Sequence, residues 1–167
     1  MGKIFTEENG QYQIDCSKAV WATDELDKKY HSSGCLLSDV DWIIETSKAI
    51  YMIEYKNASV EGAVNPGAFN PRSNKKIDGV VRKFYDSLHY LTLQDKNKPR
   101  EYVYILEYPN GDSVSRKLIR NHLKTKLPFA LQENMGTGKR LIEKIDVLSI
   151  SEWNADPKYG EFPIQHV

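Results

Sequence analysis

Apolar residues recur along this chain at two different spacings, and these spacings predict which segments form helices and which form strands. Residues 17–30 carry apolar side chains three or four positions apart, which is typical of an amphipathic helix. Residues 36–45 and 49–55 are short runs rich in β-branched and aromatic residues, which favours strands. Because the polar break at 46–48 is short, these two strands are expected to form an antiparallel hairpin, with residues 35–37 adding a strand upstream.

The rest of the chain alternates between helix and strand patterns. The segment 57–76 contains several turn signals and predicts a long loop, of the kind that is usually functional or mobile. Residues 77–91 and 115–127 are amphipathic and predict helices. The nearly continuous apolar run at 101–108 predicts a central strand, and 142–150 a last strand before an irregular tail. The order α-β-β-β-α-β-α-β predicts an α/β fold with helices flanking a mixed central β-sheet.

Composition narrows the class of protein. The 167 residues fit one domain, 1–167, and no stretch approaches the roughly 18 apolar residues of a membrane-spanning helix. Residues 1–9 lack the apolar core of a secretory signal, so a cytoplasmic protein without membrane attachment is expected. Cys16 and Cys35 have no metal-ligand spacing and are expected to be small buried residues. The formal net charge of +0 counts mildly against nucleic-acid binding, although a local basic stripe is sufficient for it.

One group of polar residues in the predicted hairpin carries chemistry. Side chains two positions apart in a strand share a face, so Glu54 and Lys56 point to one side and Tyr55 to the other. Asp41 lies on the paired strand, where its carboxylate can come near that of Glu54. Two converging carboxylates suit Mg²⁺, and a nearby lysine can hold or activate a water molecule for phosphodiester hydrolysis.

Asp41 followed by Glu54-Tyr55-Lys56 resembles the D-(x)n-(D/E)xK signature of the PD-(D/E)XK nucleases, the restriction-endonuclease-like superfamily. The resemblance covers about residues 16–108, with 109–167 as a C-terminal extension. It implies a restriction-endonuclease-like fold, in which helices flank a mixed four-stranded sheet. It also implies roles for the site residues: Asp41 and Glu54 as ligands of Mg²⁺ or Mn²⁺, the backbone carbonyl of Tyr55 as a further ligand, and Lys56 as the residue that assists the attacking water.

The chain departs from the family pattern in several places. No proline precedes Asp41, and Asp39 shares its strand face, so either acid can be the first ligand. Many members carry a further acid on the first helix, for which Glu25 is the first candidate here and Asp24 the second. No glutamine marks the helix after the motif, where Lys83 and Asp86 stand instead.

Basic residues follow the motif directly and are candidates for contacts to phosphates that position a nucleic acid over the metal. A second basic group lies on the 115–127 helix and is either another contact surface or a solvated face. The segment 136–139 resembles a phosphate loop but lacks the first glycine and the final Ser or Thr, so it predicts a flexible loop. The first basic group consists of Arg72, Lys75, Lys76, Arg82 and Lys83, and the second of Arg116, Lys117, Arg120, Lys124 and Lys126.

Three hypotheses follow. The first is a divalent-metal-dependent nuclease that hydrolyses phosphodiester bonds, expected to be a DNA endonuclease with DNA preferred over RNA; a module of this size can form a homodimer to cut two strands. The second is a non-catalytic module on the same fold that binds nucleic acid or protein. The third is a structural or regulatory subunit with an unrelated α/β fold, which predicts that Asp41 and Glu54 lie well apart.

Overall fold

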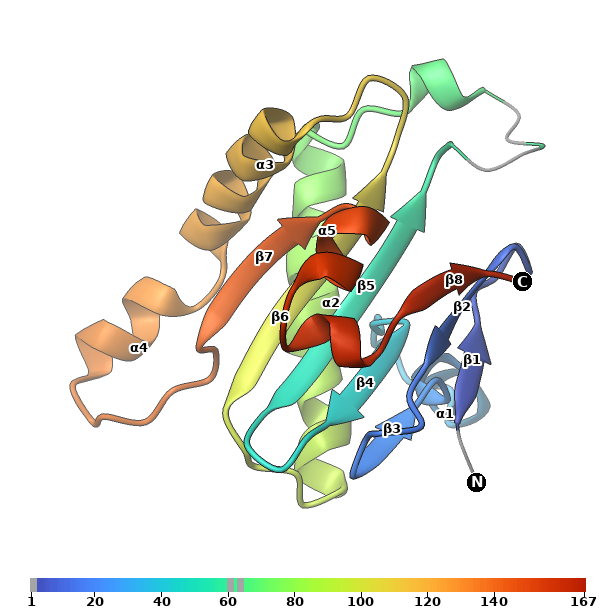
Figure 1. The fold of residues 1–167 in the computed structure, drawn as a ribbon. Helices are drawn as coiled ribbons and strands as arrows, with labels where there is room; N and C mark the ends of the chain where they lie inside the picture. Colours follow the sequence, from blue (N-terminus) through green and yellow to red (C-terminus); the bar gives the residue numbers. More distant parts are fainter. Residues whose placement is uncertain (1–2, 60–61, 63–64) are drawn as a thin grey trace.

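A mixed five-stranded sheet forms the centre of the computed structural model, which describes residues 3–59, 62 and 65–167. Its strand order is β3-β4-β5-β6-β7; the first three strands are antiparallel, and β5, β6 and β7 are parallel (Figure 1). The α/β class with a mixed sheet flanked by helices is therefore confirmed. The strands are β3 (Trp21–Thr23), β4 (Trp42–Glu45), β5 (Ile50–Asn57), β6 (Arg100–Glu107) and β7 (Lys144–Leu148).

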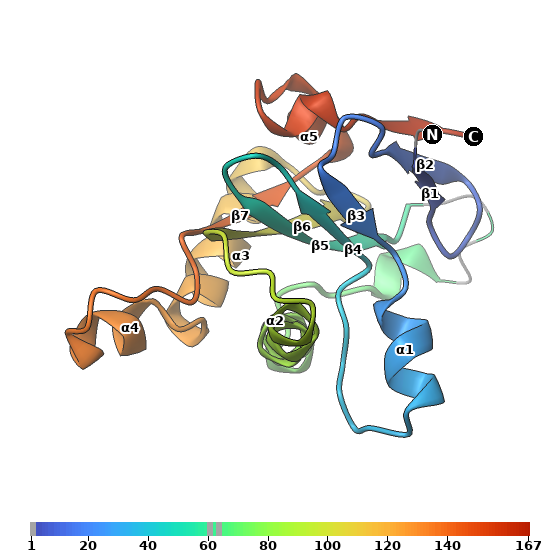
Figure 2. The ribbon, with the colours of Figure 1, turned by 90° about the horizontal axis from the view of Figure 1, so that it is seen from below.

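Helices α1, α2 and α3 lie on one face of this sheet and the short helix α5 on the other, while α4 extends away beyond α3 (Figure 2). The long helix α2 connects β5 to the parallel strand β6, the usual crossover for such a pair. Figure 2 shows α5 on the face opposite to α2, together with the N-terminal strands. The helices are α1 (Leu26–Ser32), α2 (Asn74–Leu93), α3 (Ser113–Lys126), α4 (Phe129–Met135) and α5 (Ile150–Ala155).

The side chains of β5 alternate between two cores, which fixes where its polar residues lie. Ile50 and Met52 belong to the core beneath α2, whereas Tyr51 and Ile53 belong to the core beneath α5. By this alternation Glu54 and Lys56 lie on the α2 face. The hairpin that carries them was predicted correctly: β4 pairs antiparallel with β5 across the polar break, with Trp42 opposite Ile53.

The N-terminal helix expected at 17–30 is wrong. Trp21–Thr23 forms β3 at the edge of the sheet, where the backbone N–H of Val20 donates to the carbonyl of Glu45 at 2.9 Å, and the helix begins only at Leu26. Sheet pairing therefore prevails over the helical spacing of a few apolar residues in this segment.

The strand expected at 35–37 is also wrong, and the one expected at 36–45 begins only at Trp42. The preceding backbone binds α2 instead of another strand: the N–H of Ser38 donates to Asp86 and that of Val40 to Ser87. Cys35 lies in this irregular segment and is exposed, contrary to the expectation of burial, whereas Cys16 is buried.

A small antiparallel sheet joins the two ends of the chain, in the order β1-β2-β8 (Figure 1). The expected irregular tail is therefore wrong, since it contains α5, a 3₁₀ turn and β8. Aromatic side chains pack together in this tail: Trp153 stacks on Tyr159 with ring centroids 4.8 Å apart and donates to the carbonyl of Phe162. The elements involved are β1 (Ile4–Thr6), β2 (Tyr12–Asp15), the 3₁₀ turn (Tyr159–Glu161) and β8 (Ile164–His166).

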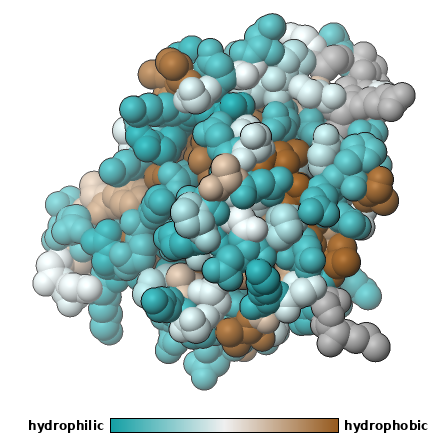
Figure 3. Space-filling view, viewed as in Figure 1, coloured by the Kyte–Doolittle hydropathy of each residue, from teal (hydrophilic) through white to brown (hydrophobic). Residues whose placement is uncertain are grey.

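The segment expected to be a long loop connects β5 to α2 and contains a 3₁₀ turn at Pro66–Ala68; its positions 60, 61, 63 and 64 lie outside the described residues. The face of the molecule shown in Figure 3 is mostly hydrophilic, with scattered apolar residues. Within the described part of the chain, no helix is long and apolar enough to cross a membrane.

Candidate active site

The hairpin and α2 bring two carboxyl groups and an ammonium group together on the α2 face of the sheet. Asp41 directly precedes β4, and its Oδ2 accepts a hydrogen bond of 2.7 Å from the backbone N–H of Tyr55. The Asp41 carboxyl lies close enough to Glu54 that its charge raises the pKa of that residue. The two acids are therefore near each other, which is the opposite of what the unrelated-fold hypothesis predicts.

Glu54 is the most deeply buried acid of this group, with 6% of its surface exposed. Its Oε1 accepts a hydrogen bond of 2.6 Å from Lys83 Nζ, while its Oε2 is buried without a hydrogen-bond partner among the described residues. Burial raises the pKa of Glu54 well above its ordinary value, and the charge of Asp41 raises it further. A carboxylate in this position needs positive charge beside it, and Lys83 pairs with only one of its two oxygens.

Lys83 lies in the middle of α2 and provides this positive charge. Val80 and Phe84, beside it on the helix, pack into the core. The Lys83 side chain is 34% exposed, so the ammonium group lies between the carboxyl pair and solvent. Burial opposes its charged form, but the carboxylates of Glu54, Asp41 and Asp39 outweigh burial and raise the pKa of Lys83. Sequence reasoning placed Lys83 only among phosphate contacts; its position on the apolar side of α2 was the available signal for a role inside the site.

The residues present fit a hydrated divalent cation. Oxygen ligands come from Asp41 and Glu54, and the unpartnered Oε2 of Glu54 is the acceptor that such an ion would satisfy. In an extended strand the N–H and C=O of one residue point to the same edge, so the carbonyl of Tyr55 also faces the side of Asp41. No group of three or more His, Cys, Asp or Glu side chains with metal-binding geometry occurs in the described residues. Mg²⁺ suits such a sparse set because it retains several waters.

Lys56 shares a pocket with Glu54, as their common strand face predicts. The pocket has a volume of about 290 Å³, and Lys83 also lines it. Lys56 is exposed, and its Nζ lies 5.7 Å from the centre of the Phe69 ring. It therefore remains available to a water molecule or a phosphate.

The other predicted acids divide between two places. Asp39 and Asp24 line an acidic pocket of about 430 Å³ with Asp41 and Lys83, and Lys56 does not line it. Glu25 does not line this pocket; it precedes α1 and lies beside Trp21 in a separate one. Of the two candidates for the further acid, the structure therefore places Asp24 rather than Glu25 near the carboxyl pair.

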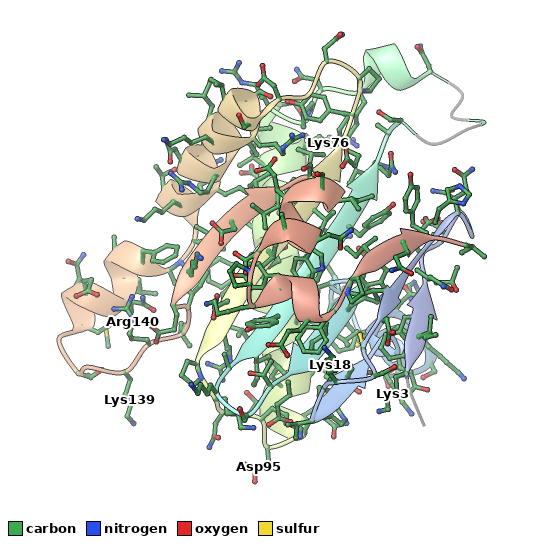
Figure 4. All side chains as sticks on the ribbon, viewed as in Figure 1. Lys3, Lys18, Lys76, Asp95, Lys139 and Arg140 are labelled. Carbon is green, nitrogen blue, oxygen red and sulfur yellow. The ribbon has the colours of Figure 1, made fainter. Side chains whose placement is uncertain are left out.

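Only some of the basic residues predicted to contact phosphates lie at the site. Lys75 and Lys76 line the pocket that holds Lys56, and Lys76 lies near the ends of β5 and β6 (Figure 4). Arg72 and Arg82 are exposed and line neither pocket of the site.

The second basic group and the glycine-rich segment lie elsewhere. Arg116 is buried and structural, since it donates to Glu152 at 3.0 Å and to a carbonyl of β6. Lys139 and Arg140 follow α4 at some distance from the central sheet (Figure 4), and Arg140 is paired with Glu133.

Comparisons with models of protein families, with curated proteins and with solved structures return no match to this chain. The function must therefore be argued from the geometry of the site.

Proposed function

We propose that this protein is a divalent-metal-dependent nuclease, expected to be a DNA endonuclease, with Asp41, Glu54 and Lys56 as its catalytic residues. One observation carries the proposal: Asp41 lies close to Glu54, and Glu54, which is buried with one oxygen unpartnered among the described residues, lines a pocket that also holds several lysines. Such an arrangement costs folding stability and is typical of functional sites.

The chemistry follows from the positions of these groups. Asp41, Glu54 and the carbonyl of Tyr55 would hold the metal ion, which, when bound, supplies a positive charge to stabilise the phosphoryl oxygens. Lys56 orients the attacking water or neutralises the phosphate, because its ammonium is exposed on the same pocket as Glu54. In the reaction a water oxygen forms a bond to phosphorus, one P–O ester bond breaks, and the leaving oxygen takes up a proton.

A cleavage assay tests this proposal. Labelled single-stranded and duplex DNA and RNA are incubated with the protein in Mg²⁺, Mn²⁺ or EDTA. We expect metal-dependent cleavage by the wild type, and for Lys56→Met a loss of about 10²-fold or more, the range of positioned proton-transfer groups. Glu54→Gln should abolish cleavage. Glu45→Gln is the matched control, because Glu45 is also buried on the hairpin and also accepts from a lysine at 2.6 Å. Absence of cleavage on every substrate and with both metals would refute the proposal.

A second candidate is the binding module without catalysis, and the contact between Lys83 and Glu54 favours it. In this case the ammonium group is the permanent counter-ion of the carboxyl pair, and no metal enters. Lys83→Met distinguishes the two candidates by Mg²⁺ titration. In a nuclease the variant should bind Mg²⁺ more tightly, because a competing cation is gone. In a binding module it should lose stability without gaining any affinity for metal.

A further inference from the structure

The pocket beside Glu54 combines cations with an aromatic ring, a combination that the proposed hydrolysis does not by itself require. Lys56 and Lys76 both approach Phe69, with their Nζ atoms 5.7 and 5.5 Å from the ring centre. The pocket volume of about 290 Å³ is near the lower end of ligand pockets, which begin at roughly 300 Å³. It has room for one small group, not for a paired duplex.

Gly79 forms part of the pocket wall in the interior of α2. A glycine there weakens the helix relative to alanine, and a side chain at this position would meet no heavy atom within 4 Å. Packing within the chain therefore does not explain the glycine. Lys75 and Lys83 stand four residues before and after it, on the same side of the helix. The missing side chain leaves the backbone open between two ammonium groups, where a phosphate or sugar can approach closely.

Phe69 closes the pocket on the loop side. Its ring is half-buried and meets Tyr108 edge-on, with centroids 6.3 Å apart and an angle of 67°. The contacts to the two lysines are weak ones at this distance and exposure. When a phosphate draws the lysine ammonium groups away, the ring can stack with a base, and stacking accepts any base because each has a π-face.

Charge limits the direction from which a nucleic acid can approach. Lys83 also lines the acidic pocket, whose six acids repel phosphates. The phosphate backbone is therefore confined to the side of Lys75 and Lys76. The acids are Glu7, Glu8, Asp24, Asp27, Asp39 and Asp41.

From these features we propose that the site takes an unpaired nucleotide of single-stranded DNA, with its phosphate between Lys75 and Lys83 over Gly79 and its base against Phe69. This inference rests on the proposed function, since it assigns the substrate class of the same site. A base held in a duplex cannot reach Phe69, because it stays stacked between its neighbours.

Fluorescence anisotropy in EDTA tests the inference without depending on cleavage. The probes are a labelled single-stranded oligonucleotide and the same sequence as a duplex. We expect the wild type to bind the single strand at least tenfold more tightly. Phe69→Leu should lose about tenfold for the single strand, in the range of one base stacked on an aromatic ring. Phe129→Leu is the matched control, because Phe129 also lies beside a lysine ammonium, at 5.4 Å, but outside the pocket.

Gly79→Ala provides a second variant whose effect cannot come from misfolding. Alanine should raise the Tm because it favours the helix, yet its methyl group should weaken single-strand binding. Equal affinity for duplex and single strand, or unchanged binding by both Phe69→Leu and Gly79→Ala, would overturn the inference. The two proposals fail separately: single-strand binding without cleavage on any substrate refutes the nuclease, whereas cleavage with equal binding of duplex and single strand refutes only the unpaired nucleotide.

Discussion

Replacing Glu54 by glutamine should stabilise the metal-free protein while removing its response to Mg²⁺. Glu54 and Glu45 are both buried glutamates of the hairpin, and each accepts a 2.6 Å hydrogen bond from a lysine. Their pKa values nevertheless shift in opposite directions. Hydrogen bonds from Lys96 and Lys98 lower the pKa of Glu45, whereas burial and the neighbouring Asp41 raise that of Glu54.

The magnitude follows from the partners of each oxygen. In Glu54→Gln the cost of a buried unpartnered oxygen, about 1–3 kcal/mol, is relieved, and the new amide can donate to Asp41. Against this, the hydrogen bond from the Lys83 ammonium loses the charge of its acceptor, a loss of about 1 kcal/mol. Lys83 is one-third exposed and can turn to water, which limits that loss. The net gain is up to about 2 kcal/mol, or up to roughly 8 °C in Tm for a chain of this size.

Thermal unfolding at pH 8, in EDTA and in Mg²⁺, measures both effects. For the wild type, Mg²⁺ at 100 times its Kd should add about 2.7 kcal/mol of stability. Glu54→Gln should be more stable than the wild type in EDTA and unaffected by Mg²⁺. Glu45→Gln should be less stable by about 2 kcal/mol, because it loses two ammonium partners that lie 22% and 32% exposed, and it should respond to Mg²⁺ like the wild type.

The opposite pattern would refute this reasoning. If Glu54→Gln is destabilised in EDTA and shows the same Mg²⁺ response as the wild type, then Glu54 is an ordinary structural ion pair and the metal lies elsewhere. A wild type that shows no Mg²⁺ response would point to the binding module with Lys83 as its counter-ion.

Three further predictions concern other parts of the molecule. The pKa of Glu45 is lowered from its ordinary value of 4.5, so its stabilising effect is complete above pH 4.5 and is lost as the pH falls through the lower folded value; the difference in Tm between wild type and Glu45→Gln should therefore shrink below pH 4.5. Gly160→Ala should cost about 1–3 kcal/mol in urea unfolding, since the new Cβ would lie 2.4 Å from a backbone oxygen of Asn154; an unchanged midpoint would show that the tail relaxes freely. Burial raises the pKa of the Cys16 thiol to about 12, so iodoacetamide should alkylate only Cys35 in the native protein and both thiols after unfolding, as counted by mass spectrometry.

The middle of the fold could be predicted from sequence because its elements are long and their patterns are local. β6 and α2 have 8 and 20 residues, long enough to show a period, and β4 and β5 are joined by a short break that fixes their pairing. The two ends of the chain could not be predicted in the same way. β1, β3 and β8 have three residues each, and β8 pairs with β2 from the opposite end of the sequence. A three-residue strand has no measurable period, and its partner cannot be found by neighbourhood along the chain.

The same difference between local and long-range features applies to the candidate site. The proximity of Asp41 and Glu54 follows from strand alternation and from the hairpin, both of which the sequence carries. The roles proposed for Lys83, Phe69 and Gly79 depend on how α2 crosses the sheet and how the preceding loop returns to it. These are long-range features, so sequence reasoning could identify Lys83 as a cation near the site but not as the partner of Glu54.

The different treatment of the two buried glutamates argues that the incomplete pairing of Glu54 serves a function. At the last residue of β4, Lys96 and Lys98 give Glu45 a partner for each oxygen, at 2.6 and 2.9 Å. On β5, Lys56 shares a strand face with Glu54 and could in principle pair with its second oxygen, yet the Lys56 ammonium lies by Phe69. Glu54 is the first residue of β5 beyond its pairing with β4, and it still pairs with the parallel strand β6. A purely structural hairpin would gain stability by pairing this buried oxygen, and a ligand such as the proposed metal ion would complete its pairing.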